Sequence, residues 1–157
     1  MPRHSLIVTA IAVISFAASA VRAQDSEVAG AEPEVVVKQF LIAMIKGDKE
    51  ALSQLALPNP ELKVLYEGPP VPAVALPIFL KQIEKEAVTR FKVGDEIKLP
   101  GGQTIVLSER HINENRVQLN VGNQPIPFPV AKHEGQWRVD ARPLIMARKA
   151  AAKMLGK

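Results

Sequence analysis

Residue types that could support catalysis or metal binding are few in this chain. Beyond its apolar start, the only histidines are His111, at the end of an expected strand, and His133, in an expected tight turn. A zinc site takes about four His, Cys or acidic ligands, and the sequence contains no cysteine. It also lacks a phosphate-binding glycine loop and a nucleophile elbow. We therefore interpret both histidines as solvated surface residues and expect neither a metal nor a cofactor.

Tyr66 and Asp140 are two other residues whose chemistry could serve a pocket. Tyr66 is the only tyrosine, and it could either donate a hydrogen bond into a pocket or pack with its hydroxyl at a rim. In the strand that ends at Asp140, alternation places this carboxylate on the face opposite Trp137 and Val139. With Trp137 in the core, Asp140 points outward, and we expect it to pair with Arg138 or to cap the following helix.

The elements that must position these residues change from helices to strands along the chain. Apolar residues at i, i+3, i+4 and i+7, starting at Val37, predict a helix that begins at Pro33 and ends before Gly47. Turns rich in Gly, Pro and Asn separate the later strands, which favours an antiparallel meander. The other predicted elements are helices over 49–57, 76–87 and 144–155, and strands over 62–67, 91–99, 103–112, 115–121, 125–132 and 136–141.

This order predicts an α+β fold. The N-terminal helices pack on one face of a curved antiparallel sheet, and a short helix follows at the C-terminal end. The helices should lie on the sheet face that carries Trp137 and Val139. We expect one contiguous core formed by Phe40, Leu41, Met44, Phe79, Ile83, Val117, Leu119 and Trp137.

The stretch 125–130 has an unusual alternation of proline with apolar residues. In a strand, alternate residues point their N–H groups to the same lateral side, so prolines at 125, 127 and 129 remove donors from one side only. The other side can still pair with one neighbour. We therefore predict an edge strand, or a strand whose second side is only loosely joined.

The first residues have the three-part pattern of a signal peptide. Arg3 and His4 form a basic start, the uncharged run 5–21 follows, and small or compact residues stand at Val21 and Ala23. This run is shorter than the roughly 20 apolar residues of a membrane span. The pattern predicts export to the periplasm or the medium, with no stable membrane anchor after cleavage. The predicted organisation is a signal peptide over 1–23, a flexible lead-in over 24–32, an α+β domain over 33–142 and a basic C-terminal helix over 143–157.

The net charge gives little support for an anionic partner. Without Arg3 and Arg22, the 20 basic residues become 18 against 16 acidic ones. The remaining excess is concentrated near the C-terminal end, where Arg148, Lys149 and Lys153 complement the dipole of a terminal helix. We expect no nucleic-acid partner.

Two short motifs resemble the NTF2-like (SnoaL-like) superfamily, over roughly residues 33–141. Lys46-Gly47-Asp48, between a buried first helix and an immediate second one, is similar to its opening. The run from Gly135 to Asp140, with Trp137 and Val139, is similar to its closing hairpin. The resemblance implies a cone-shaped fold with a pocket between helices and sheet, often in a dimer. In isomerases of that superfamily a pocket Asp removes a proton, a role that the outward direction of Asp140 argues against. Because members range from isomerases and dehydratases to non-enzymatic carriers, the resemblance does not transfer an activity.

These observations lead to two hypotheses for the function. The first is an exported, non-catalytic module that binds a small ligand or another protein. The alternative is a small cofactor-free enzyme of the isomerase, cyclase or dehydratase type, which needs at least two polar groups pointing into one pocket. The partners we expect are a small hydrophobic ligand and a second copy of the chain bound through the sheet. The expected pocket residues are Tyr66, Phe40 and Trp137.

Overall fold

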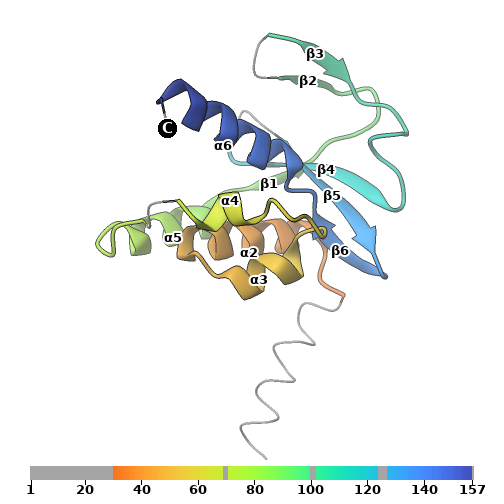
Figure 1. The fold of residues 1–157 in the computed structure, drawn as a ribbon. Helices are drawn as coiled ribbons and strands as arrows, with labels where there is room; N and C mark the ends of the chain where they lie inside the picture. The colour runs from red at the N-terminus through yellow and green to blue at the C-terminus, as the bar shows by residue number, and fades with distance from the viewer. Residues whose placement is uncertain (1–29, 69–70, 100–101, 124–126, 157) are drawn as a thin grey trace, which may run out of the picture. The chain divides into compact units, whose positions relative to one another are not determined.

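The computed structural model describes residues 30–68, 71–99, 102–123 and 127–156. The expected signal peptide, most of the lead-in, and Pro125 and Ile126 lie outside these residues. From Glu32 onward the chain forms one compact unit of helices and antiparallel strands, so the α+β fold class is confirmed (Figure 1). None of the helices described is long and apolar enough to cross a membrane.

The helices are α2 (Pro33–Lys46), α3 (Lys49–Leu55), α4 (Lys63–Tyr66), α5 (Leu76–Lys85) and α6 (Arg142–Met154). The strands are β1 (Val88–Arg90), β2 (Glu96–Lys98), β3 (Thr104–Val106), β4 (Arg116–Val121), β5 (Phe128–His133) and β6 (Gln136–Val139).

Helix α2 has the predicted bounds because its end signals are local. Pro33 stands in the first turn, and Gly47 ends the helix with a left-handed φ of 67°, a conformation that costs glycine little. Asp48 then caps α3, since its Oδ1 accepts a hydrogen bond from the N–H of Ala51 at 3.0 Å. The apolar face of α2 is almost fully covered, with Phe40 at 0% exposure.

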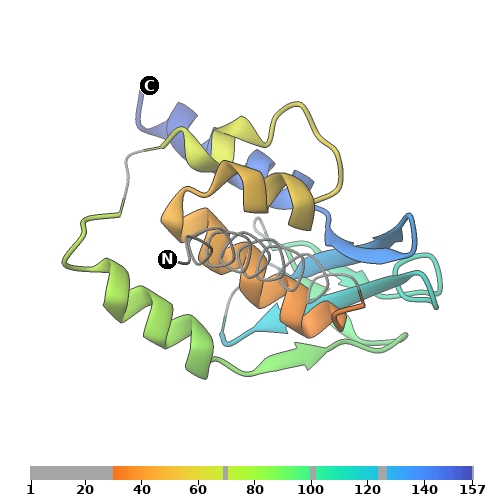
Figure 2. The ribbon, with the colours of Figure 1, turned by 90° about the horizontal axis from the view of Figure 1, so that it is seen from below.

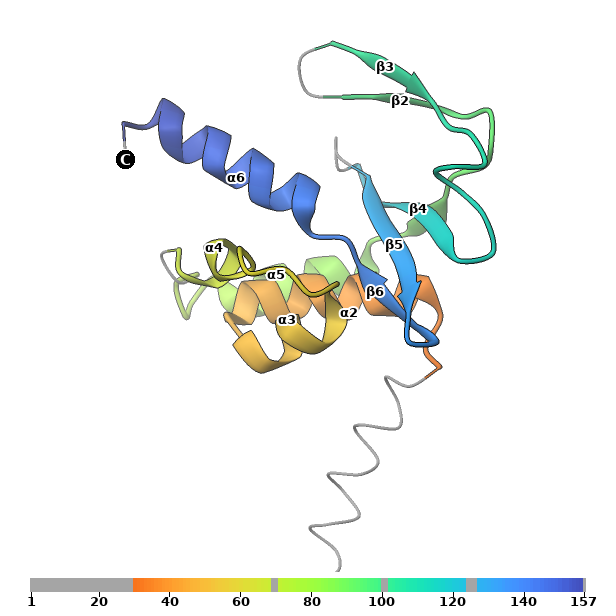
Figure 3. The same cartoon turned by 45° about the vertical axis from the view of Figure 1, so that its right-hand side comes forward.

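The main sheet has four antiparallel strands in the order β1-β4-β5-β6. Leu119 lies opposite Phe128, and Val130 lies opposite Val139. We call the face that carries these side chains the inner face, because α2 packs across it (Figure 2). Side chains alternate between the two faces along each strand, so Gln118 and Pro129 lie on the opposite face, which we call the outer face. Strands β2 and β3 form a separate two-stranded ribbon (Figure 3).

The first alternative for the proline-rich stretch, an edge strand, is wrong, because β5 lies between β4 and β6. The second alternative, a strand whose second side is only loosely joined, agrees with Phe128 and Pro129, which pair with β4 while the ladder to β6 begins at Val130. The prolines do affect one side only. The carbonyl of Pro129 points toward β6, where it accepts a hydrogen bond from the N–H of Asp140 at 2.8 Å. The missing donor of Pro129 therefore also points toward β6, and the pairing of the two strands begins at Val130. Since β6 ends at Val139, the proline stands where that ladder stops.

Three predicted strands take a different form. The segment 62–67 contains α4 instead of a strand, with Leu62 and Leu65 buried at helical spacing. In so short an apolar run, the sequence pattern does not distinguish the 3.6-residue period of a helix from the two-residue period of a strand. The long strands expected over 91–99 and 103–112 shrink to β2 and β3. A turn interrupts the first, where Oδ2 of Asp95 accepts from the N–H of Lys92 at 2.7 Å.

The expected core is correct for Phe40, Leu41, Val117 and Leu119, whereas Met44 and Trp137 are only half-buried and the residues of α5 are not buried. Phe79 is 45% exposed, and α5 has no buried residue. The reason is position: α5 packs against α2 but is left open to solvent along much of its surface. Trp137 is half-buried on β6, on the same face as the fully buried Val139.

Candidate functional site

One cavity in the described part of the chain has a volume of about 460 Å³. It lies between the C-terminal turn of α2, α4 with the loop that follows it, and α6. We call it the α2–α4–α6 cavity. Its walls are mainly aliphatic, which suits an apolar ligand. The lining residues are Met44, Ile45, Lys46, Gly47, Leu65, Tyr66, Gly68, Val71, Leu144, Ala147 and Arg148.

Helix α6 forms one wall because three contacts hold it in place. Ile145, in its first turn, is only 1% exposed. The guanidinium of Arg148 donates a hydrogen bond to the carbonyl of Leu65 in α4. Lys149 forms an ion pair with Glu61 just before α4. The surface ion pair contributes little by itself, so burial of Ile145 and the Arg148 bond are the main restraints.

The ionisable groups that line this cavity are Lys46, Tyr66 and Arg148. The ammonium group of Lys49 lies 5.3 Å from the ring centre of Tyr66, a cation–π contact that helps to hold the ring. Neither a carboxylate nor a histidine is among the lining residues described. A cavity with aliphatic walls and two cationic side chains can bind an apolar body with a negatively charged end.

A second cavity, of about 260 Å³, adjoins the first and shares Met44, Ile45 and Leu144 with it. It extends between α2, α5 and the inner face of the sheet. Glu86 is the only carboxylate among the residues described as lining it. Glu86 lines a different cavity from the ionisable groups Lys46, Tyr66 and Arg148.

The structure places the three predicted pocket residues differently. Tyr66 lines the α2–α4–α6 cavity, whereas Phe40 and Trp137 do not. Phe40 is fully buried in the core. Trp137 lies on β6, where the ammonium group of Lys132 is 5.1 Å from its ring centre.

Leu144, Ala147 and Arg148 were missed as cavity residues because the last helix was interpreted as a basic tail. Their spacing at i, i+3 and i+4 is the sequence signal that could have identified them.

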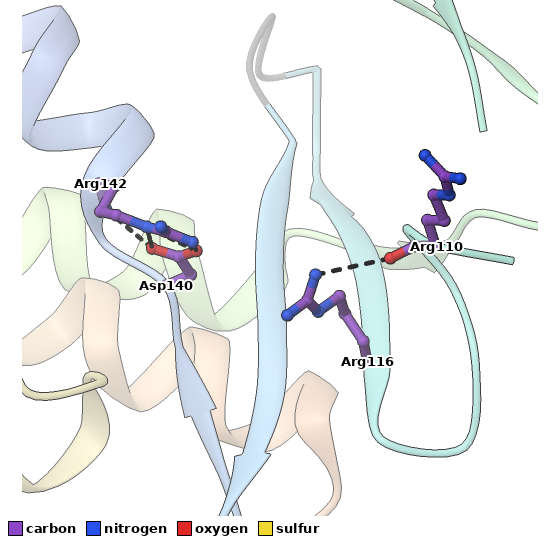
Figure 4. Close-up of polar contacts among 4 residues, drawn as sticks. All are labelled: Arg110, Arg116, Asp140 and Arg142. Carbon is purple, nitrogen blue, oxygen red and sulfur yellow. Dashed lines mark hydrogen bonds and ion pairs between the residues drawn. The ribbon is translucent and has the colours of Figure 1, made fainter. Parts of the chain in front are cut away.

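Asp140 lies on the outer face, as strand parity predicted, but its ion-pair partner is Arg142 instead of Arg138 (Figure 4). Its Oδ1 also accepts a hydrogen bond at 3.2 Å from the N–H of Arg142, the first residue of α6, which agrees with the alternative that Asp140 caps this helix. The Nε of Arg142 lies 2.8 Å and 3.0 Å from the two carboxylate oxygens. Burial alone would raise the pKa of Asp140. The hydrogen bonds from Arg142 and the charges of Arg142 and Arg116 outweigh that effect and lower the pKa below its usual value.

The expectation that His111 is a solvated surface residue is also wrong. It is half-buried and lines a third, smaller cavity. Its Nδ1 accepts a hydrogen bond from the N–H of Ser108 at 3.1 Å, so in the neutral ring the proton is on Nε2. His133 is half-buried as well. Among the residues described, no three His, Asp or Glu side chains lie close enough to hold a metal ion.

Comparisons with family models, with curated proteins and with solved structures find no match for this chain. The function must therefore be argued from the geometry above.

Proposed function

We propose that this protein is an exported, non-catalytic carrier that binds a small amphiphile in the α2–α4–α6 cavity. The apolar body of the ligand lies among Met44, Leu65 and Leu144, and its negatively charged end lies beside Lys46 and Arg148. The observation that carries the proposal is the composition of this wall: it is largely aliphatic, and its charged groups are all cationic. Affinity then comes from burial of apolar surface, and the cations select the charge of the ligand.

We further propose that the chain has an NTF2-like fold. The support is the order of elements: α2 and α3 come first, a four-stranded antiparallel sheet follows, and α2 packs on one of its faces. The α2–α4–α6 cavity is lined by helices and a loop, whereas the second cavity reaches the inner face of the sheet at Val121 and Phe128.

Binding is preferred over the enzyme alternative because of the lining groups. An isomerase or dehydratase needs a base and an acid that act on the same substrate atoms. Tyr66 has no carboxylate or histidine beside it among the residues that line its cavity.

Thermal shifts with three matched amphiphiles test the proposal: dodecanoate, dodecanol and dodecyltrimethylammonium, each below its micelle concentration. We expect dodecanoate to stabilise the protein most and the cationic amphiphile least. A ligand present at 100 times its Kd adds about 2.7 kcal/mol of stability. Equal stabilisation by all three head groups, or none by any, would contradict the proposal.

Two tryptophan substitutions on α6 provide a matched control. Ala147 lines the cavity, whereas Ala150 is exposed on the same helix. Ala147→Trp should fill the cavity and remove the shift, and Ala150→Trp should keep it. Arg148→Gln gives an independent check if the first variant folds poorly, because it should reduce the preference for dodecanoate over dodecanol. A full response in both Ala147→Trp and Arg148→Gln would place the ligand elsewhere.

A further inference from the structure

The third cavity lies on the outer face of the sheet and shares no lining residue with the α2–α4–α6 cavity. Its volume is about 180 Å³. It is lined by β4 and β5, by the segment that follows β6, by Leu57 after α3, and by the loop before β4. The lining residues are Leu57, His111, Arg116, Gln118, Pro129, Ala131, Asp140 and Arg142.

Gln118 is the most informative of these residues. It stands in the middle of β4 and is only 8% exposed, although its amide has donor and acceptor groups to satisfy. Its side chain lines the cavity, and among the hydrogen bonds described none joins its amide to another residue; the amide is open to the cavity and is not enclosed by protein. An amide that opens into a cavity can bond there to water or to a polar group of a ligand.

Two arginines flank β5 on this face, and their charges are not equally compensated (Figure 4). Arg142 is held on both oxygens of Asp140. Arg116 makes one long hydrogen bond, 3.5 Å from its guanidinium to the carbonyl of Arg110. Arg116 is exposed, and among the hydrogen bonds described its other donors have no protein partner, so they can bind a planar, negatively charged group in a bidentate manner.

The remaining lining groups limit the charge and size of a ligand. Apart from His111, two arginines and one aspartate leave a net charge of +1. The carboxylate of Asp140 would repel a dianion more than a monoanion. Leu57, Pro129 and Ala131 supply small apolar walls, and the Nε2–H of His111 adds a hydrogen-bond donor.

We propose that this outer cavity binds a small hydroxycarboxylate. Its carboxylate pairs with the guanidinium of Arg116, and its hydroxyl pairs with the amide of Gln118. The site is independent of the amphiphile carrier function, so either proposal can fail without the other.

NMR titration of the ¹⁵N-labelled full chain tests this assignment through the side-chain NH₂ signals of Gln118. The probes are sodium lactate, inorganic phosphate and neutral propane-1,2-diol, at constant ionic strength set with NaCl. Lactate should shift the Gln118 signals saturably, and propanediol should not. Phosphate should need a several-fold higher concentration, because it carries more negative charge toward Asp140. Phosphate binding as tight as that of lactate would overturn the assignment to carboxylates.

Two neighbouring arginines supply the matched control. Arg116→Gln should abolish the saturable shift. Arg110→Gln should retain it, because Arg110 contacts the site through its main-chain carbonyl only. Gln118→Leu, followed through the backbone signals of Ala131, should also lose it. The site is ruled out by a lactate shift that does not saturate, or by one that Arg116→Gln and Arg110→Gln weaken equally.

Discussion

Two phenylalanines on neighbouring helices differ in burial, although the spacing of apolar residues predicts that both lie in the core. Phe40 on α2 is fully buried, whereas Phe79 on α5 is 45% exposed. Truncation of Phe40 to Ala should lower the free energy of unfolding by about 3–5 kcal/mol, because it removes a buried ring and leaves a cavity. Phe79→Ala should cost about 1 kcal/mol or less. Urea denaturation of both variants measures the difference, and similar costs would contradict the placement of α5.

The Asp140–Arg142 pair makes part of the stability dependent on pH. The folded-state pKa of Asp140 is lowered, so its contribution is complete above the unfolded value of about 3.9 and is lost as the pH falls through the folded value. Asp140→Asn should therefore be less stable than the wild type at pH 7, and the gap should narrow below about pH 4. Thermal melts from pH 7 to pH 2.5 provide the measurement.

Arg138→Gln is the control for that experiment, since Arg138 does not pair with the carboxylate of Asp140 among the hydrogen bonds described. Its stability difference from the wild type should not follow the same pH course. A gap between Asp140→Asn and the wild type that stays constant down to pH 2.5 would show that the ion pair does not stabilise the fold.

At the scale of elements, substitutions at two glycines with positive φ test whether a neighbouring side chain adds to the cost of an alanine in a turn. Gly47 ends α2 with open space around it, whereas a Cβ on Gly122, after β4, would overlap the carboxylate of Glu86. Gly47→Ala should cost about 1–2 kcal/mol from backbone strain alone. Gly122→Ala should cost about the same, because the carboxylate of Glu86 is the far end of a flexible side chain and can move aside. A clearly higher cost for Gly122→Ala than for Gly47→Ala, measured by urea denaturation, would mean that Glu86 is held against this turn.

The position of β5 corrects the interpretation of the prolines at the same scale. A strand between two neighbours loses a ladder bond wherever a proline replaces a donor. Here Pro129 meets β6 at the end of that strand, so the four-stranded sheet accommodates it without losing a bond in its interior. Replacing Pro129 by a residue that has an N–H donor would therefore not expose an unpaired strand edge.

At the scale of the whole molecule, export remains a prediction that rests on residues 1–23. The exported protein should begin at Gln24, because Val21 and Ala23 present small or compact side chains to signal peptidase. Intact-mass measurement on material from outside the cytoplasm identifies the first residue. Ala23→Leu should slow processing and leave a longer product. A mass that includes Met1–Ala23 in the unaltered protein would contradict the cleavage prediction.

Local patterns in the sequence determined the α+β class, the bounds of α2 and the faces of β6. Each depends on neighbouring residues: the i, i+3, i+4 spacing from Val37, the end signals at Pro33 and Gly47, and the alternation around Trp137. The outward direction of Asp140 follows from the same alternation. These features need no knowledge of which element packs against which.

Only the tertiary structure decided which elements become neighbours. It left α5 partly open, so that Phe79 is exposed, and it placed β5 between two strands. It also packed α6 against α4, so that the basic C-terminal helix forms a wall of the α2–α4–α6 cavity. In addition, it placed Arg142 beside Asp140. The outer cavity at Gln118 depends on residues from 57 to 142 that meet only in the folded chain. The spacing of apolar residues indicates which face of a helix or strand is apolar, but it does not indicate which other element covers that face.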